Sequence, residues 1–316
     1  MTKKKKNLIL GVVKTYPYKK LKPFIETLNK TSFDGELVLF VSEVSKRTKK
    51  NLRKNRVKLI EFENTCPRYQ VKGLENFEKR PFNQNIPLVS QRFLLYLDYL
   101  QKNKQKYKNV MLTDIGDVVF QKNLFGFGID DKLCVFEIGG KIGDANQKGI
   151  DYIPLAKRLG VSDLKEYKQK KILCAGTTIG PTKRILEYLK KMKKYLDKGN
   201  DQALHNYLVY SKKLKNVEIF ENGNKILTIG RPELFEKHAK IKNIRIHNKK
   251  GQLINVIHNY DRHPKVLRLF GGQQKNSLVQ AIHNSRWRMK ISKIKNKIYK
   301  IPILGEFIRK VYIGLR

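Results

Sequence analysis

The chain has few acidic residues for its size. Its 316 residues include 27 Asp and Glu but 68 Lys and Arg, which gives a formal net charge of +41. Such an excess of positive charge favours polyanionic partners, namely nucleic acid, an anionic membrane or phosphorylated substrates. A lysine-rich, solvated surface produces the same total, so the net charge by itself identifies no partner.

Cysteines and long apolar segments are also scarce. The three cysteines, Cys66, Cys134 and Cys174, are widely spaced and odd in number, which is typical of reduced thiols in a cytosolic protein and argues against a disulfide scaffold or a zinc cluster. No apolar run approaches the roughly 20 residues of a membrane-spanning helix. The basic N-terminus leads into the apolar run 8–13, and no small-residue cleavage site follows. No signal peptide is predicted, and we expect a cytoplasmic protein.

Hydrophobic residues make up 40% of the chain, which is enough for a packed core. In the N-terminal part, short apolar runs alternate with segments of helical spacing. The runs 7–13, 36–42, 57–62 and 109–114 predict strands, and the segments 18–30, 45–54 and 87–102 predict helices. This alternation is typical of parallel β-α-β units whose sheet is covered on both faces. We therefore predict an α/β fold with a mostly parallel central sheet and a ligand site at the carboxyl ends of its strands.

The later part of the chain continues this pattern and then changes. Further strands are predicted at 132–138, 172–180, 217–220 and 225–229, further helices at 151–159, 162–170, 182–197 and 201–211, and a long loop at 63–84. From about residue 272 acids are rare, and basic residues around Trp287 interleave with Ile291, Ile294 and Ile298. We predict one domain over 1–270 and a basic amphipathic helical tail over 271–316. Such a tail either binds an anionic membrane surface or packs its apolar residues on the core.

One acidic turn is the strongest candidate for a functional site. The apolar run 109–113 ends in Asp114-Ile115-Gly116-Asp117, after which apolar residues resume. Two carboxylates at the end of a buried strand repel each other, and a bound divalent cation relieves that repulsion. Mg²⁺ and Mn²⁺ prefer such oxygen ligands and bridge them to substrate phosphates. The alternative is that Asp114 caps the turn and Asp117 is solvated.

Three later segments carry further candidate residues. The small-residue strand around Gly176 allows a substrate to approach the backbone closely, or is only tightly packed. Asp201 is either the N-cap of the predicted helix 201–211 or a residue of the site. The apolar residues 256–257 lead into His258, a competent ligand for Mn²⁺, followed by Asp261 and Arg262. Arg262 is suited to bind a diphosphate through bidentate hydrogen bonds.

The order of these segments, over roughly 7–265, resembles the A-type glycosyltransferases. Asp114 and Asp117 resemble that family's Asp-x-Asp motif with one extra residue between the acids, as in uncharacterised bacterial and viral transferase-like proteins. The resemblance implies a single Rossmann-like domain in which Asp114, Asp117 and His258 bind the metal. It also places Gly176 beside the donor sugar and Asp201 at the sugar or acceptor. The nucleotide would lie on Val12, Val13 and Thr15 and beside Asp114, with Arg92 at the diphosphate.

This resemblance implies transfer of a sugar from a nucleotide-diphosphate donor, with Mn²⁺ or Mg²⁺, to a hydroxyl of a glycan or glycolipid. Surface polysaccharide or lipopolysaccharide assembly at the inner face of a membrane is the setting we expect. An inverting enzyme needs a carboxylate base, for which Asp201 and Asp261 are the candidates, whereas a retaining enzyme needs none. The rival hypotheses are a nucleic-acid-binding protein or metal-dependent nuclease, and a non-catalytic transferase-like protein. The dispersed lysines and the lack of a nucleic-acid-binding signature argue against nucleic acid.

Overall fold

The computed structural model describes residues 4–62, 88–145, 150–230 and 232–271. The chain divides into two compact units, Met1–His263 and Pro264–Arg316. Cys66, the predicted loop 63–84 and all of the predicted tail except Gly271 lie outside the described residues, so the domain boundary and the tail helices stay predictions. Among the helices that are described, none is both long and apolar enough to cross a membrane.

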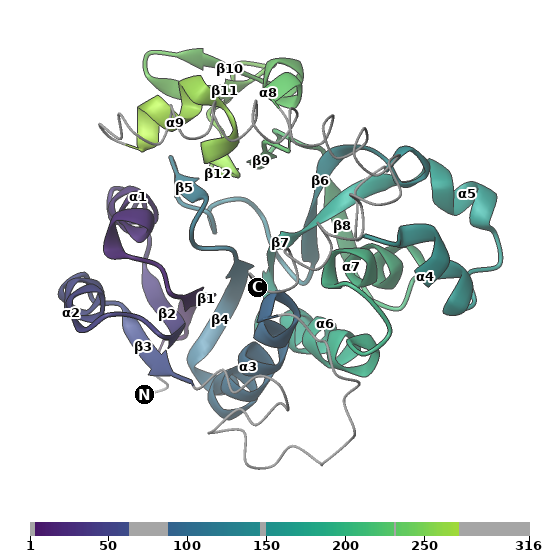
Figure 1. Ribbon diagram of the computed structural model, residues 1–316, viewed down its shortest axis with the longest axis horizontal. Helices are drawn as coiled ribbons and strands as arrows, with labels where there is room; N and C mark the ends of the chain where they lie inside the picture. Colours follow the sequence, from purple (N-terminus) through teal and green to yellow (C-terminus); the bar gives the residue numbers. More distant parts are fainter. Residues whose placement is uncertain (1–3, 63–87, 146–149, 231, 272–316) are drawn as a thin grey trace, which may run out of the picture. The chain divides into compact units, whose positions relative to one another are not determined.

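A seven-stranded sheet forms the centre of the first unit, as far as the chain is described (Figure 1). In spatial order its strands are β3 (Lys58–Glu61), β2 (Gly35–Ser42), β1 (Lys6–Lys14), β4 (Tyr107–Thr113), β7 (Lys171–Pro181), β6 (Leu133–Lys141) and β8 (Val217–Phe220). Neighbouring strands run parallel except at β7, which is antiparallel to both β4 and β6. The predicted α/β fold with a mostly parallel sheet is confirmed.

Helices cover both faces of this sheet (Figure 1). One face packs against α1 (Tyr18–Asn29) and α2 (Lys46–Lys54). The other packs against α3 (Leu88–Asn103), α4 (Tyr152–Arg158), α5 (Leu164–Gln169), α6 (Thr182–Tyr195) and α7 (Asp201–Tyr210). In β1, Leu8 and Leu10 face the second set of helices, while Ile9 and Val13 face the first. Because both faces are buried, the strand is a continuous apolar run instead of an alternating one.

The structure also contains a second, smaller sheet, of which the sequence pattern predicts only some strands. It joins β5 (Val118–Phe120), β12 (Val256–His258) and β9 (Ile226–Thr228), with β12 in the middle. β12 is antiparallel to β5 and parallel to β9. The residues between β9 and β12 form α8 (Pro232–His238) and a hairpin of β10 (Ala239–Lys242) and β11 (Arg245–Asn248). The second unit is described through α9 (Pro264–Phe270).

Candidate functional site

The acidic turn connects the central sheet to the small sheet. Asp114 directly follows β4, and its backbone N–H donates to the Gly176 carbonyl of β7 at 3.0 Å. Asp117 directly precedes β5. Between them, Ile115 is 2% exposed and packs over Gly11 of β1, where a Cβ would lie 2.1 Å from its Cδ1 atom. The buried Ile115 therefore anchors the turn and leaves both carboxylates at the carboxyl end of β4.

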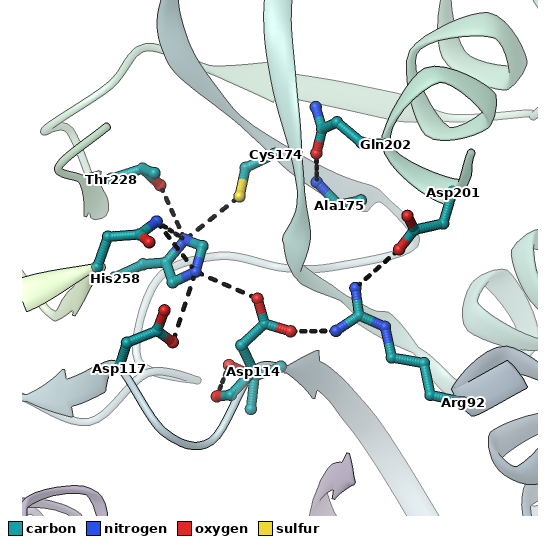
Figure 2. A network of polar contacts seen from close by, with 11 residues as sticks. Arg92, Asp114, Asp117, Cys174, Ala175, Asp201, Gln202, Thr228 and His258 are labelled. Carbon is teal, nitrogen blue, oxygen red and sulfur yellow. Dashed lines mark hydrogen bonds and ion pairs between the residues drawn. The ribbon is translucent and has the colours of Figure 1, made fainter. Parts of the chain in front are cut away.

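The register of the small sheet brings His258 to these carboxylates. His258 pairs with Val118, the residue next to Asp117. Its Nε2 atom lies 3.3 Å from Asp114 Oδ2 and 3.8 Å from Asp117 Oδ1, and one ligand atom of each residue falls within 4.8 Å of the others. Figure 2 shows the imidazole pointing toward both acids. The three residues predicted as metal ligands are thus brought together.

The opposite edge of the imidazole has its own partners. The Nδ1 atom of His258 lies 3.3 Å from Cys174 Sγ and 3.5 Å from Thr228 Oγ1 (Figure 2). The amide of Asn259 lies against the ring between the two edges, with its Nδ2 atom 3.3 Å from Nδ1 and 3.2 Å from Nε2. A proton on Nδ1 that is donated to Cys174 or Thr228 leaves the Nε2 lone pair directed at the carboxylates, which is the tautomer that a metal ligand requires.

Gly176 provides the space in which these groups meet. A Cβ at this position would lie 2.5 Å from Asp114 Oδ2 and 2.7 Å from His258 Cε1. Any side chain would therefore displace one of the two. The donor set, two carboxylates and one imidazole beside a backbone without a side chain, fits Mn²⁺ in its choice of atoms, and fits Mg²⁺ less well because Mg²⁺ prefers oxygen ligands.

A buried arginine joins two of the predicted site residues. Arg92, on α3, donates from Nη1 to Asp114 Oδ1 and from Nη2 to Asp201 Oδ2, the latter at 3.1 Å (Figure 2). Asp201 opens α7 but does not cap it, because the side chain of Asn200 accepts the hydrogen bond from Gln202 N at 2.9 Å. The alternative that Asp201 serves as the N-cap is therefore wrong. Its carboxylate is instead 8% exposed and paired with Arg92.

Electrostatics distinguishes the two acids of the turn. Burial disfavours the Asp114 carboxylate, but Arg92 and His258 outweigh burial and hold the pKa of Asp114 well below its usual range. Burial raises the pKa of Asp117, and the charge of Asp114 adds to that effect. For His258, burial opposes the charged form, yet Cys174 and Asp114 raise its pKa well above the ordinary value. A cation and a proton on Nε2 compete for one position, so cation binding would release a proton.

A cavity of about 320 Å³ opens beside the turn. Its walls include the predicted Val12, Thr15 and Arg92 together with Asp114 and Asp117. Val13 is fully buried in the core on the α1 face, so the prediction that its side chain lines the nucleotide site is wrong. In a strand, successive side chains point to opposite faces, which explains why Val12 reaches the cavity and Val13 does not.

Basic residues outside the predicted set also line this cavity. Lys14 and Lys20 stand in its wall with Arg92. Lys20 donates to Asp261 Oδ2 at 2.9 Å, which ties the predicted Asp261 to α1. Arg262 instead donates to the Gly230 carbonyl at 3.4 Å. Neither Lys20 nor Cys174 stands in a recognisable pattern, since each reaches the site only through tertiary packing.

No model of a known protein family matches the chain, and no curated protein matches it. Among solved structures, the crystal structure of an active-site mutant of LgtC has a TM-score of 0.46 and 12% sequence identity, over 88% of this chain and 95% of that chain. A likeness of this strength assigns neither a family nor an activity.

Proposed function

We propose that this protein is a glycosyltransferase that takes a nucleotide-diphosphate sugar as donor and a divalent cation as cofactor. The observation that carries the proposal is the approach of Asp114, Asp117 and His258 to within 4.8 Å of one another at the carboxyl end of β4. In open α/β sheets ligands bind at that edge, and the cavity of about 320 Å³ lies there. The order of motifs along the chain, which resembles that of the A-type glycosyltransferases, supports the same proposal.

The walls of the cavity suit the parts of such a donor. Val12 and Thr15 would contact the nucleoside, whereas Val13 is not part of the cavity wall. Lys14, Lys20 and Arg92 supply positive charge for the diphosphate. The space at Gly176 is filled by Asp114 and His258, so the sugar would lie on the cavity side of Asp114 instead of against the Gly176 backbone. Arg262 would reach the diphosphate only after releasing the Gly230 carbonyl.

The chemistry requires stabilisation of the diphosphate that leaves as the glycosidic bond breaks. Asp114, Asp117 and His258 would hold a cation, which would supply this stabilisation by charge neutralisation. Arg92 is fixed in advance by Asp114 and Asp201, so little reorganisation accompanies the reaction. The tautomer of His258 is set by Cys174 and Thr228.

The two candidate bases differ in availability. The Asp201 carboxylate is 8% exposed and paired with Arg92, whereas that of Asp261 is 33% exposed and paired with Lys20 at the cavity wall. In an inverting reaction Asp261 would therefore deprotonate the acceptor hydroxyl, and Asp201 would position Arg92. In a retaining reaction neither is needed as a base. A glycan or glycolipid in surface polysaccharide or lipopolysaccharide assembly is the acceptor we propose, on the inner face of a membrane.

The test is a panel of nucleotide-sugars with Mn²⁺ or Mg²⁺, scored by released nucleotide. We expect one donor to be turned over, and Asp117→Ala to lower that rate at least a hundredfold, since it removes a cation ligand that holds the leaving group. Asp98→Ala is the matched control, because the contact of Asp98 within the described residues is an i,i+4 pair with Lys102 on α3 and such pairs contribute little.

Three outcomes oppose the proposal. Full activity of Asp117→Ala in EDTA contradicts the cation site. If the protein binds nucleotides but releases no nucleotide from any of the donor sugars, it is a non-catalytic protein. Cation-dependent cleavage of DNA or RNA that is lost in Asp117→Ala indicates a nuclease instead.

A further inference from the structure

The turn of the β10–β11 hairpin is strained at one residue. Lys242 pairs with Arg245, which leaves Asn243 and Ile244 as a two-residue turn. Both have positive φ, 49° for Asn243 and 54° for Ile244. A two-residue turn of this kind favours Asn followed by Gly. A β-branched side chain at positive φ is a genuine outlier, so the local conformation is costly at Ile244.

The same residue is also the most exposed large hydrophobic side chain among those that the structure describes. Ile244 is 80% exposed, compared with 41% for Ile219 and 39% for Tyr16. One exposed aliphatic residue needs no explanation on an ordinary surface. An exposed isoleucine in a strained turn is different, because glycine would relieve both costs.

Positive charge surrounds this isoleucine. Lys242 lies directly opposite Arg245, and Lys240 lies opposite His247 on the same face of the hairpin. Like charges placed directly opposite each other destabilise a strand pair. The segment from residue 237 to residue 260 contains six Lys and Arg and no Asp or Glu.

The other face of the hairpin fixes it to the first unit. Ala239 and Ile246 are fully buried there. The side chain of Gln121 both donates to the Ile246 carbonyl and accepts from the Ile246 N–H, at 2.9 and 2.8 Å. The hairpin is therefore held by one face and presents the basic face and the apolar tip to solvent.

We propose that this hairpin docks the protein on an anionic lipid bilayer, with Ile244 entering the acyl boundary and Lys240, Lys242 and Arg245 among the lipid phosphates. A bilayer relieves both exposed features, since it takes up the apolar tip and neutralises the like charges beside it. Nucleic acid would neutralise the charges but offers the tip no apolar medium. The inference is independent of the proposed transferase activity and of the C-terminal tail.

The first test compares binding of the full chain to vesicles of phosphatidylcholine with and without phosphatidylglycerol. We expect Ile244→Gly to weaken binding to the anionic vesicles roughly tenfold, in line with partial burial of one aliphatic side chain. The same variant should melt no lower than the wild type, because glycine suits the turn. Ile219→Thr, at the other exposed isoleucine, should leave binding unchanged.

Charge is tested with the double variant Lys242→Gln/Arg245→Gln, for which we expect a loss of binding on the order of tenfold or more. A probe at the tip reports insertion directly, whatever other segments bind. Trp287 is the one tryptophan of the chain, so Ile244→Trp in a Trp287→Phe background emits from position 244 alone. Anionic vesicles should shift its emission to the blue, and brominated lipids should quench it.

Three results overturn this proposal. One is binding by Ile244→Gly that equals the wild type together with an unshifted emission at position 244. Another is equal binding to phosphatidylcholine alone. The third, binding of duplex DNA that weakens with Ile244→Gly, without vesicle binding, assigns the hairpin to nucleic acid instead.

Discussion

At position 176 the backbone of β7 passes directly beside two of the three proposed cation ligands. A methyl group there would lie 2.5 Å from Asp114 Oδ2. We expect Gly176→Ala to lower Mn²⁺ affinity on the order of tenfold to a hundredfold, the range found when groups that orient metal ligands are changed. Titration calorimetry or the electron paramagnetic resonance signal of free Mn²⁺ measures this without any donor.

Gly126→Ala is the matched control for that measurement. A Cβ at Gly126 meets only the Asn123 carbonyl oxygen, at 3.6 Å, so its Mn²⁺ affinity should equal that of the wild type. Wild-type affinity in Gly176→Ala would show that the cation does not lie between Asp114 and His258.

The sequence predicts the three residues that we propose as cation ligands, but not the residues that surround them. Asp114, Asp117 and His258 were predicted as a set, and the structure brings them together. The sequence does not predict that Cys174 contacts His258 or that Lys20 lines the cavity. The contact of Cys174 with His258, for example, spans 84 positions of the chain. Val13 was misplaced because a one-residue difference along a strand reverses the face to which a side chain points.

At the scale of single elements, α7 carries a buried histidine. His205 is fully buried and shares a hydrogen bond of 2.9 Å with Tyr188, and burial lowers its pKa to about 3. In the unfolded chain a histidine titrates near its ordinary value of about 6.5. Below that pH the histidine binds a proton in the unfolded state but not in the folded state. Folding stability therefore decreases as the pH is lowered from about 6.5 toward 3.

When the pH is lowered from 7 to 5, we therefore expect His205 to reduce the free energy of unfolding by about 2 kcal/mol. Urea unfolding of the wild type and of His205→Gln, at both pH values, measures this contribution as a difference. The glutamine variant keeps a polar partner for Tyr188 and should lose correspondingly less stability on acidification. Parallel losses in the two proteins would contradict the assignment.

The elements also show where local pattern fails. The run 172–180 was predicted as a strand, and β7 is one, but its direction opposite to β4 and β6 is set by its neighbours and leaves no mark on the apolar pattern. β5 has three residues, too few for a period to be read. The hairpin of β10 and β11 was missed because Ile244 stands where glycine normally signals such a turn.

For the whole molecule, the excess of positive charge has a thermodynamic effect. A net charge of +41 destabilises the compact state through self-repulsion. Raising NaCl from 0.01 to 0.1 M shortens the screening length from about 30 to about 10 Å. We expect the melting temperature to rise by a few degrees over this range, as roughly 1 kcal/mol of relieved repulsion would produce.

Scanning calorimetry measures that rise, and a neutral osmolyte at matched osmolality separates screening from general solvent effects. A melting temperature that stays constant or falls over the same range would mean that the charges are too far apart to repel.

At the scale of the whole molecule, composition and the alternation of apolar runs with helical segments predict the α/β class correctly, because burial on both faces of a sheet follows directly from continuous apolar strands.

The position of β12 has a consequence for how the protein is made. All seven strands of the central sheet end by Phe220, but His258 lies in β12, which pairs with β5. During synthesis the central sheet can therefore assemble before His258 has left the ribosome. The proposed cation site is complete only after almost the whole first unit has emerged, so we expect chains that terminate before His258 to lack this site even when their sheet has folded.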